Sequence, residues 1–324
     1  MILAGIDEAG YGPLLGPLVV GCCAFEIDGA DVSDDEIPCL WKRLRRYVSR
    51  NRLKSGRKIH VNDSKLVYSS AQGLMELERA VLAIAAATGD WCAGLSQFLD
   101  FVAPGAAQEA MQYAWYEAPA DERFPLQQEA MAVQLFAKAL RQEMEQTGAR
   151  GIHLAAQIVF ERRFNQMLTA TRNKSTTLFS IAAAHLDHLL RAYGRRDLVI
   201  VCDQQGGRER YGPLLRLMFP DWSLEIEYER DGTSAYRLDQ DGHFVRLFFR
   251  EKAEATCLPV AVASMLSKYL RETMMTRFNA FWRRHLPDVS PTAGYYGDGL
   301  RFLTDIAAKR QELGISDEQM VRAR

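Results

Sequence analysis

Hydrophobic and polar positions at the start of the chain predict two strands. Residues 2–6 are almost continuously apolar, and a second apolar run, 18–26, follows a segment rich in glycine and proline. We expect strands at 2–7 and 18–26, paired antiparallel through the glycine-rich turn. Further along, residues 70–87 have helical spacing, and residues 91–98 have the pattern of another strand.

The rest of the chain alternates between helical and strand-like patterns. Apolar residues at helical spacing predict a helical insertion at about 100–150, centred on 105–147. The remaining predicted elements are a strand at 151–160, an amphipathic helix at 177–193, a strand at 197–202 buried on both faces, strands or a hairpin within 223–250, a long helix from 259 to about 281, and a helical tail from about 285 with a last helix whose N-cap is Asp298.

This order of elements predicts an α/β fold with a mixed sheet flanked by helices and carrying a helical insertion. No internal repeat, low-complexity linker or domain boundary is visible, so we expect one domain over residues 1–324. The chain is 48% hydrophobic and 25% charged, which is typical of a globular protein with a substantial core.

Cysteine usage and hydropathy predict the compartment. The six cysteines form no CxxC pair, so we expect reduced thiols and a cytoplasmic protein. The longest early apolar stretch, 14–25, is too short to cross a membrane and follows no basic leader, so neither a membrane span nor a signal peptide is expected. We also expect a monomer.

A net charge of −1 conceals a local asymmetry. Residues 28–36 carry five acids, whereas residues 42–58, the basic block, carry nine Lys or Arg and no acid. Such a block is either a solvated surface or a surface that binds nucleic-acid phosphates.

Four carboxylates stand at the ends of apolar segments. Asp7 and Glu8 end the first strand, Asp203 ends the buried strand, and Glu254 lies between an apolar run and the long helix. Taken alone, the first pair also fits an edge strand that ends in a polar turn. If all four converge, they repel one another unless cations bind between them, and oxygen ligands suit Mg²⁺ or Mn²⁺. Two such ions about 3.5–4 Å apart suit phosphoryl transfer.

Five motifs in a fixed order resemble the type 2 ribonucleases H, the HII and HIII families. They are residues 7–20 (DEAGYGPLLGPLVV), residues 62–66 (NDSKL), residues 163–165 with Asn173, Lys174 and His185, the pair Asp203-Gln204, and residues 252–254 (KAE) followed by 260–264 (VAVAS). The matches run from residue 5 to about 275, and a weaker match lies in the tail.

The resemblance implies a ribonuclease H-like fold and metal-dependent cleavage of the RNA strand of RNA–DNA hybrids or other RNA-containing duplexes, leaving 3′-hydroxyl and 5′-phosphate ends. Carried over residue by residue, Asp7, Glu8, Asp203 and Glu254 would be the catalytic residues and the ligands of Mg²⁺ or Mn²⁺. A Glu in the fourth place is the HIII pattern, whereas HII enzymes have Asp there.

The family resemblance also implies substrate contacts. The Gly10-Tyr11-Gly12 turn would read the ribose 2′-hydroxyl, although Tyr11 stands where HII enzymes have arginine and HIII enzymes a small polar residue. Ser64 and Lys65 of the DSK motif would bind the substrate, with Lys65 as a phosphate ligand. The segment 206–211 is unlike either family.

Four of the candidate substrate-binding side chains have two interpretations each. Lys65 is a phosphate ligand or a solvent-facing lysine, and Arg208 contacts the nucleic-acid backbone or is a turn charge. Lys268 matches a basic family position or is a surface lysine. Tyr296 packs on a DNA sugar, a role that Tyr295 could also fill, or belongs to the core.

Three functions remain open on the sequence alone. The leading one is a hybrid-cleaving endoribonuclease. The others are a nuclease of the same fold acting on another nucleic acid such as structured DNA, and a non-catalytic nucleic-acid-binding relative. Binding alone does not require four carboxylates, which argues against the last.

Overall fold

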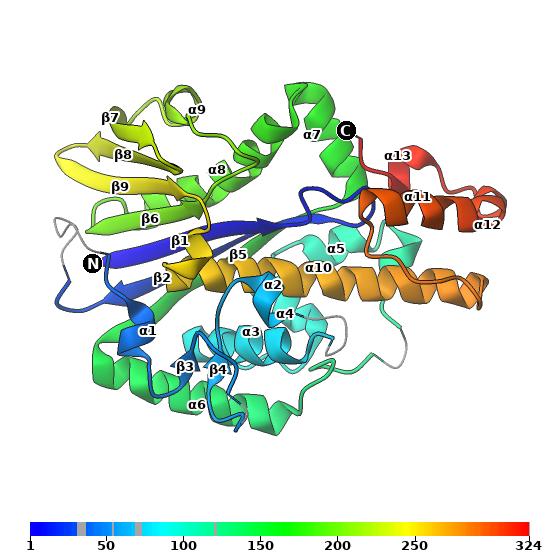
Figure 1. Ribbon diagram of the computed structural model, residues 1–324, viewed down its shortest axis with the longest axis horizontal. Coiled ribbons are helices and arrows are strands. Elements are labelled where there is room, and N and C mark those ends of the chain that lie inside the picture. The colour runs from blue at the N-terminus through cyan, green and yellow to red at the C-terminus, as the bar shows by residue number, and fades with distance from the viewer. Residues whose placement is uncertain (31–36, 54, 69–72, 120–121, 324) are drawn as a thin grey trace.

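A computed structural model of the chain describes residues 1–30, 37–53, 55–68, 73–119 and 122–323. Its centre is a seven-stranded mixed sheet with helices on both faces (Figure 1), as the sequence predicts. In the order β5-β2-β1-β6-β9-β8-β7, the strands are Ala149–Val159, Leu18–Ile27, Ile2–Ala9, Leu198–Asp203, His243–Arg250, Thr233–Gln240 and Ser223–Arg230. A separate pair consists of β3 (Val48–Ser49) and β4 (Ile59–His60).

Strand direction decides where the ends of the strands meet. β1 is antiparallel to β2, as expected, and parallel to β6, which is in turn parallel to β9. The carboxyl ends of β1, β6 and β9 therefore lie at one edge of the sheet, which is where open α/β sheets place their sites.

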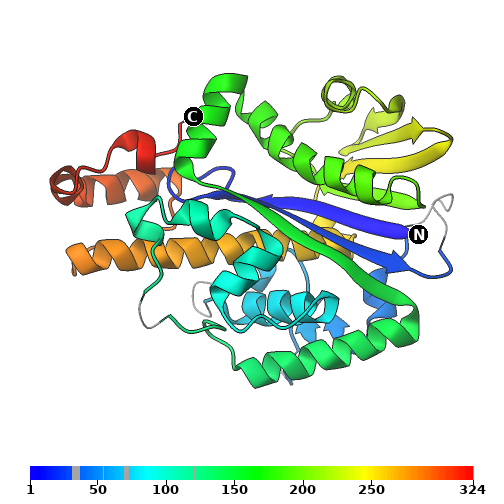
Figure 2. The same ribbon diagram turned by 180° about the vertical axis from the view of Figure 1, so that it is seen from behind.

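Two layers of helices cover the sheet. The helices are α1 (Leu40–Arg43), α2 (Ser64–Val67), α3 (Met75–Thr88), α4 (Leu95–Val102), α5 (Ala106–Ala110), α6 (Ala130–Thr147), α7 (Glu161–Thr171), α8 (Lys174–Tyr193), α9 (Gly212–Met218), α10 (Leu258–His285), α11 (Tyr296–Asp305), α12 (Ala307–Glu312) and α13 (Asp317–Met320), with the 3-10 turns η1 (Ala114–Tyr116) and η2 (Ala253–Ala255). Figure 1 shows α8 and α9 on one side of the sheet and α10, α3 and α6 on the other, and Figure 2 shows this arrangement from behind.

Side chains of β1 alternate between two hydrophobic cores. Leu3 belongs to the core beneath α10 and α3, whereas Ile2, Ala4 and Ile6 belong to the core beneath α8 and α9. A strand buried on both faces needs apolar residues at every position, which explains the continuous apolar run at the start of the sequence.

Helix α10 lies unusually close to β1 and β2. A Cβ on Gly5 would lie 2.2 Å from the Val260 nitrogen, and one on Gly21 would lie 2.5 Å from the Ala263 oxygen. Glycine at these positions lets the helix backbone rest directly on the sheet.

Two predictions of local structure are wrong. The segment 91–98 is not a strand, because Leu95, Phe98, Leu99 and Val102 repeat at helical spacing and form the buried face of α4. Helix α11 begins at Tyr296, with Tyr295 rather than Asp298 at its N-cap.

The Asp298 carboxylate nevertheless satisfies a backbone donor, in the turn before the helix. It accepts hydrogen bonds from the Thr292 hydroxyl, at 2.5 Å, and from the Ala293 nitrogen, at 2.9 Å.

Other expectations hold with shifted boundaries. The predicted helix 70–87 is α3, although residues 70–72 lie outside the described residues. Residues 100–150, predicted as a helical insertion, contain α5, η1 and α6, and 223–250 forms three strands. All six cysteines are free. Within the described residues, no helix combines the length and apolarity that a bilayer span requires.

Candidate active site

Two neighbouring carboxylates leave the carboxyl end of β1. Asp7 is buried and Glu8 is half-buried, and the Glu8 nitrogen donates to Asp7 Oδ1 over 2.7 Å. The Ser267 hydroxyl of α10 donates to the Asp7 carbonyl at 3.1 Å. The end of the strand is therefore held against α10.

The other two carboxylates are joined through η2. Asp203 ends β6, the strand beside β1, and its Oδ1 accepts a hydrogen bond from the Ala253 nitrogen at 3.0 Å. This bond places the neighbouring Glu254 side chain against Asp203. Lys252, which precedes η2, has φ of 55°, a left-handed conformation that is uncommon for a non-glycine residue and is concentrated at functional sites.

The four carboxylates lie close enough together for charges within the group to affect one another. Burial, and then the charges of Glu8 and Asp203, raise the pKa of Asp7 well above its usual value. Burial and the charge of Asp203 raise the pKa of Glu8 to about 8, with a smaller contribution from Glu254. Burial and the Glu254 charge raise the pKa of Asp203 to about 7. Neighbouring carboxylates therefore oppose the ionisation of Asp7, Glu8 and Asp203, and such a group of acids is suited to cations.

The residues present fit hard divalent cations. All four side chains offer oxygen, the ligand that Mg²⁺ and Mn²⁺ prefer. Glu254 Oε2 is buried and has no hydrogen-bond partner, which is costly without a cation. In the part of the chain that the structure describes, no three carboxylates bring ligand oxygens within 4.8 Å of one another, so the group is wider than a cage for one ion.

Two serines connect the DSK motif to the carboxylates. The hydroxyls of Ser64, at the start of α2, and Ser264, on α10, lie 3.0 Å apart. Ser264 also hydrogen-bonds the Asp7 side chain, which lowers the pKa of that carboxyl against the effect of burial. Lys65 follows Ser64, is exposed, and its charge lowers the pKa of Glu8. The DSK motif therefore brings one cation, Lys65, to the neighbourhood of Glu8.

The glycine-rich turn follows directly. Gly10 has φ of 89°, and a Cβ there would lie 2.6 Å from the Arg271 side chain and 2.7 Å from the Pro17 carbonyl, so only glycine fits. A Cβ on Gly12 would meet no atom within 4 Å, so the backbone is open on that side.

Tyr11 lies between the turn and the segment after Asp203. The Lys174 ammonium stands 5.1 Å from the centre of its ring, and a Cβ on Gly206 would lie 3.2 Å from the ring. Burial and the Glu8 charge raise the pKa of Tyr11, while the Arg208 charge lowers it. Arg208 donates to the Ser175 hydroxyl at 3.0 Å, so it lies at the rim of the site beside the start of α8.

Two further predicted substrate residues lie on α10 and α11. Lys268 makes an ion pair of 2.8 Å with Glu272 and stands 4.7 Å above the ring of Tyr68. Tyr296 is exposed at the start of α11. The segment before α11 contacts the turn, because the Gly294 carbonyl accepts from the Leu14 nitrogen at 2.7 Å.

Several cations of the basic block make contacts within the protein. Arg43 donates to the Thr147 carbonyl at 2.8 Å, Arg50 covers the ring of Trp41 at 4.2 Å, and Arg52 lies 3.8 Å from Glu76. Phosphate binding by the block stays a prediction, as does its alternative, a solvated surface; Lys54 lies outside the described residues.

Sequence reasoning overlooked the residues that support the carboxylates. Ser264 and Ser267 are three residues apart in an otherwise apolar stretch of α10, and two polar residues on one buried helix face are a usable signal. The contact between Lys174 and Tyr11 joins segments more than 160 residues apart and leaves no local signal.

No protein-family model matches the chain, and no curated protein sequence matches it either. Solved structures of type 2 ribonucleases H do match. They include the RNase HII of Archaeoglobus fulgidus in complex with PCNA (15% identity, 100% of this chain and 95% of that chain, TM-score 0.43). Others are ribonuclease H2 of Pyrococcus horikoshii (14%, 99% and 92%, 0.41) and Bst-RNase HIII in complex with Mn²⁺ (13%, 99% and 66%, 0.41). At these values the case for a function rests on the chain's own residues.

Proposed function

We propose that this protein is a metal-dependent endonuclease that cleaves the RNA strand of RNA–DNA hybrids, leaving 3′-hydroxyl and 5′-phosphate ends. One observation supports the proposal. The charges of Asp7, Glu8, Asp203 and Glu254 act on one another at the carboxyl edge of the sheet, although up to 247 residues separate them in sequence. Mutually repelling acids are costly in the absence of bound cations and have no evident use in binding an anionic polymer without them.

The four carboxylates would hold Mg²⁺ or Mn²⁺. Bound there, two such ions supply activation of water and stabilisation of the leaving oxygen in an in-line displacement. Asp203 and Glu254, fixed by the Ala253 nitrogen, would form one side of the site. Asp7 and Glu8, fixed by Ser264 and Ser267, would form the other.

Neighbouring residues would bind the nucleic acid. Lys65 is exposed beside Glu8 and suits a phosphate next to the scissile bond. The open backbone at Gly12 suits close approach of a ribose 2′-hydroxyl, the group that distinguishes RNA from DNA. Arg208 at the rim suits a phosphate further along the strand. We propose that residues 1–324 act as one unit and as a monomer.

The direct test is cleavage of end-labelled RNA–DNA hybrid with Mg²⁺ or Mn²⁺, by the wild-type protein and by Asp203→Asn. The variant removes one ligand charge and nearly preserves shape, so cleavage should fall at least about a thousandfold, the equivalent of roughly 4 kcal/mol. The unfolding temperature of the metal-free variant should not fall below that of the wild type, because the variant loses a charge that repels its neighbours. Asp241→Asn is the matched control: Asp241 is exposed in the β8–β9 turn at φ of 53°, which asparagine tolerates.

The substrates separate the alternative functions. Preferential cleavage of structured DNA would identify a nuclease of the same fold with another substrate. Binding of hybrid without any cleavage, in either metal, would identify a non-catalytic relative. Undiminished cleavage by Asp203→Asn would remove the proposed chemistry altogether.

A further inference from the structure

A second cluster of ligand-type side chains lies on the sheet face beneath α8. In the β2–β5 ladder, Cys22 pairs with Ala155 and Ala24 with His153. Residues two apart on a strand share a face, so the Cys22 and His153 side chains project to the same side. His185 comes from α8, which covers that face, and is buried with Cys22.

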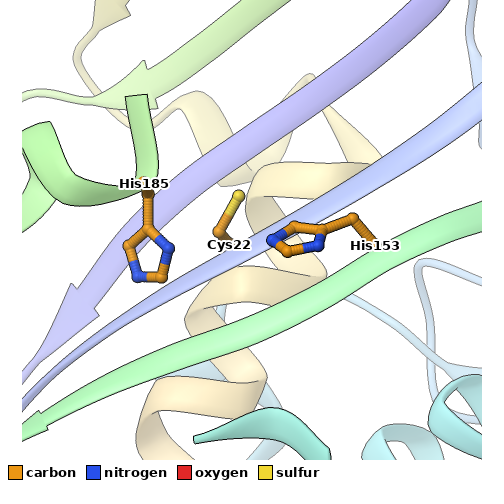
Figure 3. Close-up of side chains that lie close together, drawn as sticks. All are labelled: Cys22, His153 and His185. Atoms are coloured by element: carbon orange, nitrogen blue, oxygen red, sulfur yellow. The ribbon is translucent and has the colours of Figure 1, made fainter. Parts of the chain in front are cut away.

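The three side chains point toward one another. Their ligand atoms all lie within 4.8 Å, and no other such group of His, Cys, Asp or Glu occurs among the residues that the structure describes. Figure 3 shows Cys22 between the two imidazole rings, with a ring nitrogen of His153 directed at it. Two ligand atoms on one tetrahedral Zn²⁺ stand about 3.5 Å apart, so small rotations of these side chains would complete the geometry.

Hydrogen bonding leaves one nitrogen of each ring available. His185 Nε2 contacts the Val20 carbonyl at 3.0 Å, which makes Nε2 the protonated nitrogen and leaves Nδ1 as a free electron pair. A backbone carbonyl that orients a histidine in this way is the usual support of a metal ligand. His153 Nε2 is buried without a hydrogen-bond partner. A buried polar nitrogen with no partner calls for a ligand.

We propose that Cys22, His153 and His185 form a binding site for one borderline-soft divalent cation of the Zn²⁺ class, separate from the carboxylate site. Thiolate sulfur and imidazole nitrogen are both ligands that Zn²⁺ takes, and a site with three protein ligands leaves a fourth position open. The exposed His188 ring stacks on His153 at 4.4 Å and fixes its orientation, and water would take the fourth position. The ion would tie α8 to β2 and β5.

The protonation states agree with this assignment. Burial, and then the neighbouring histidines, lower the pKa of His153 to about 4, and burial lowers the pKa of His185 to about 4, so both rings are neutral at pH 7. Burial raises the pKa of the Cys22 thiol, which is therefore protonated in the metal-free protein. Binding replaces the S–H bond by a metal–sulfur bond and releases one proton to buffer.

The test titrates metal-free, reduced protein with CoCl₂ and, separately, with ZnCl₂. We expect one high-affinity ion per chain, a thiolate-to-Co²⁺ charge-transfer absorption that Zn²⁺ abolishes, and release of about one proton per ion by calorimetry in two buffers. Thermal unfolding should shift upward with Zn²⁺, because the ion binds only the folded chain.

Substitutions assign the ligands. His153→Gln should weaken Zn²⁺ binding at least about a hundredfold, since loss of supporting residues alone costs 10–100-fold. Cys22→Ser should abolish the charge-transfer absorption. Cys92→Ser and His243→Gln, which remove a thiol and an imidazole elsewhere, should bind as the wild type does. Asp203→Asn should also keep the Co²⁺ absorption, which distinguishes this site from the carboxylates.

Two results would overturn the proposal. One is the absence of the charge-transfer absorption in correctly folded wild-type protein at excess Co²⁺. The other is Zn²⁺ affinity that His153→Gln leaves unchanged, which would make the cluster a packed core of thiol and imidazole groups.

Discussion

At the scale of single residues, opposing interactions act on the carboxylates of the candidate active site. Burial and like charges disfavour ionisation of Asp7, whereas a hydroxyl from Ser264 favours it. Under the proposed function, Ser264 would act through Asp7, because its hydroxyl favours the charged carboxyl that a cation would bind. It would be a positioning residue rather than a catalytic one.

Ser264→Ala tests this role. The variant loses one hydrogen bond to the Asp7 carboxylate, worth about 1–2 kcal/mol, so the Mg²⁺ concentration for half-maximal cleavage should rise roughly 5- to 30-fold. Thr273→Val is the control, because it removes another buried hydroxyl from α10, one that bonds the Tyr269 carbonyl at 2.9 Å. Both variants should lose stability, but only Ser264→Ala should change the Mg²⁺ requirement. An equal requirement in both would make Ser264 merely structural.

At the scale of elements, the sequence predicted best where burial is uniform. The strands 2–7 and 197–202 lie within a residue or two of β1 and β6, because strands buried on both faces must be apolar throughout. The prediction of a strand at 91–98 failed because the first four residues form a loop and the last four begin an amphipathic helix. An eight-residue window that spans such a boundary contains too little of either period to separate them.

The contact between α10 and β1 gives a prediction at this scale. In Gly5→Ala the new Cβ would lie 2.2 Å from the Val260 nitrogen and 2.3 Å from the Pro259 carbonyl carbon. Both are backbone atoms, which cannot rotate out of the way as a side chain can. We expect the free energy of unfolding to fall by about 3 kcal/mol or more, measured in urea. Cleavage should fall too, because the shift moves α10 relative to Asp7.

Gly94→Ala is the matched control for this change. Gly94 has φ of −149°, and a Cβ there would meet no atom within 4 Å. Its unfolding free energy should stay within about 0.5 kcal/mol of the wild type. If Gly5→Ala is equally stable, α10 does not lie as close to the sheet as described.

At the scale of the whole molecule, the sequence located candidate ligands but not their supports. Asp7, Glu8, Asp203 and Glu254 could be proposed because each ends an apolar segment and belongs to a recognisable motif. The attachment of the tail could not: Arg322 is buried and donates to the Pro13 carbonyl at 3.1 Å, more than 300 residues away. Lone arginines near chain ends are ordinary, and only the tertiary contact reveals that this one holds the glycine-rich turn.

Under the proposed function, substrate choice would depend on this assembled turn. The half-buried Tyr11 ring packs beneath the Lys174 ammonium and close to Gly206, so part of its surface is used for contacts within the protein. The part of the turn left open is the backbone at Gly12. Recognition that relies on backbone alone suits a substrate with many 2′-hydroxyls and an A-like minor groove better than one with a single ribose.

We therefore expect continuous RNA–DNA hybrid to be cut at least about tenfold faster than DNA duplex with one embedded ribonucleotide, a difference of roughly 1.4 kcal/mol, at matched salt and metal. Gly12→Ala is the accompanying variant, since its Cβ disturbs no protein atom and would face the substrate. Its stability should equal that of the wild type, and its cleavage of hybrid should fall. Faster cutting at the single ribonucleotide would mean that the turn still reads one 2′-hydroxyl despite Tyr11, and unchanged cleavage by Gly12→Ala would mean that the ribose approaches from elsewhere.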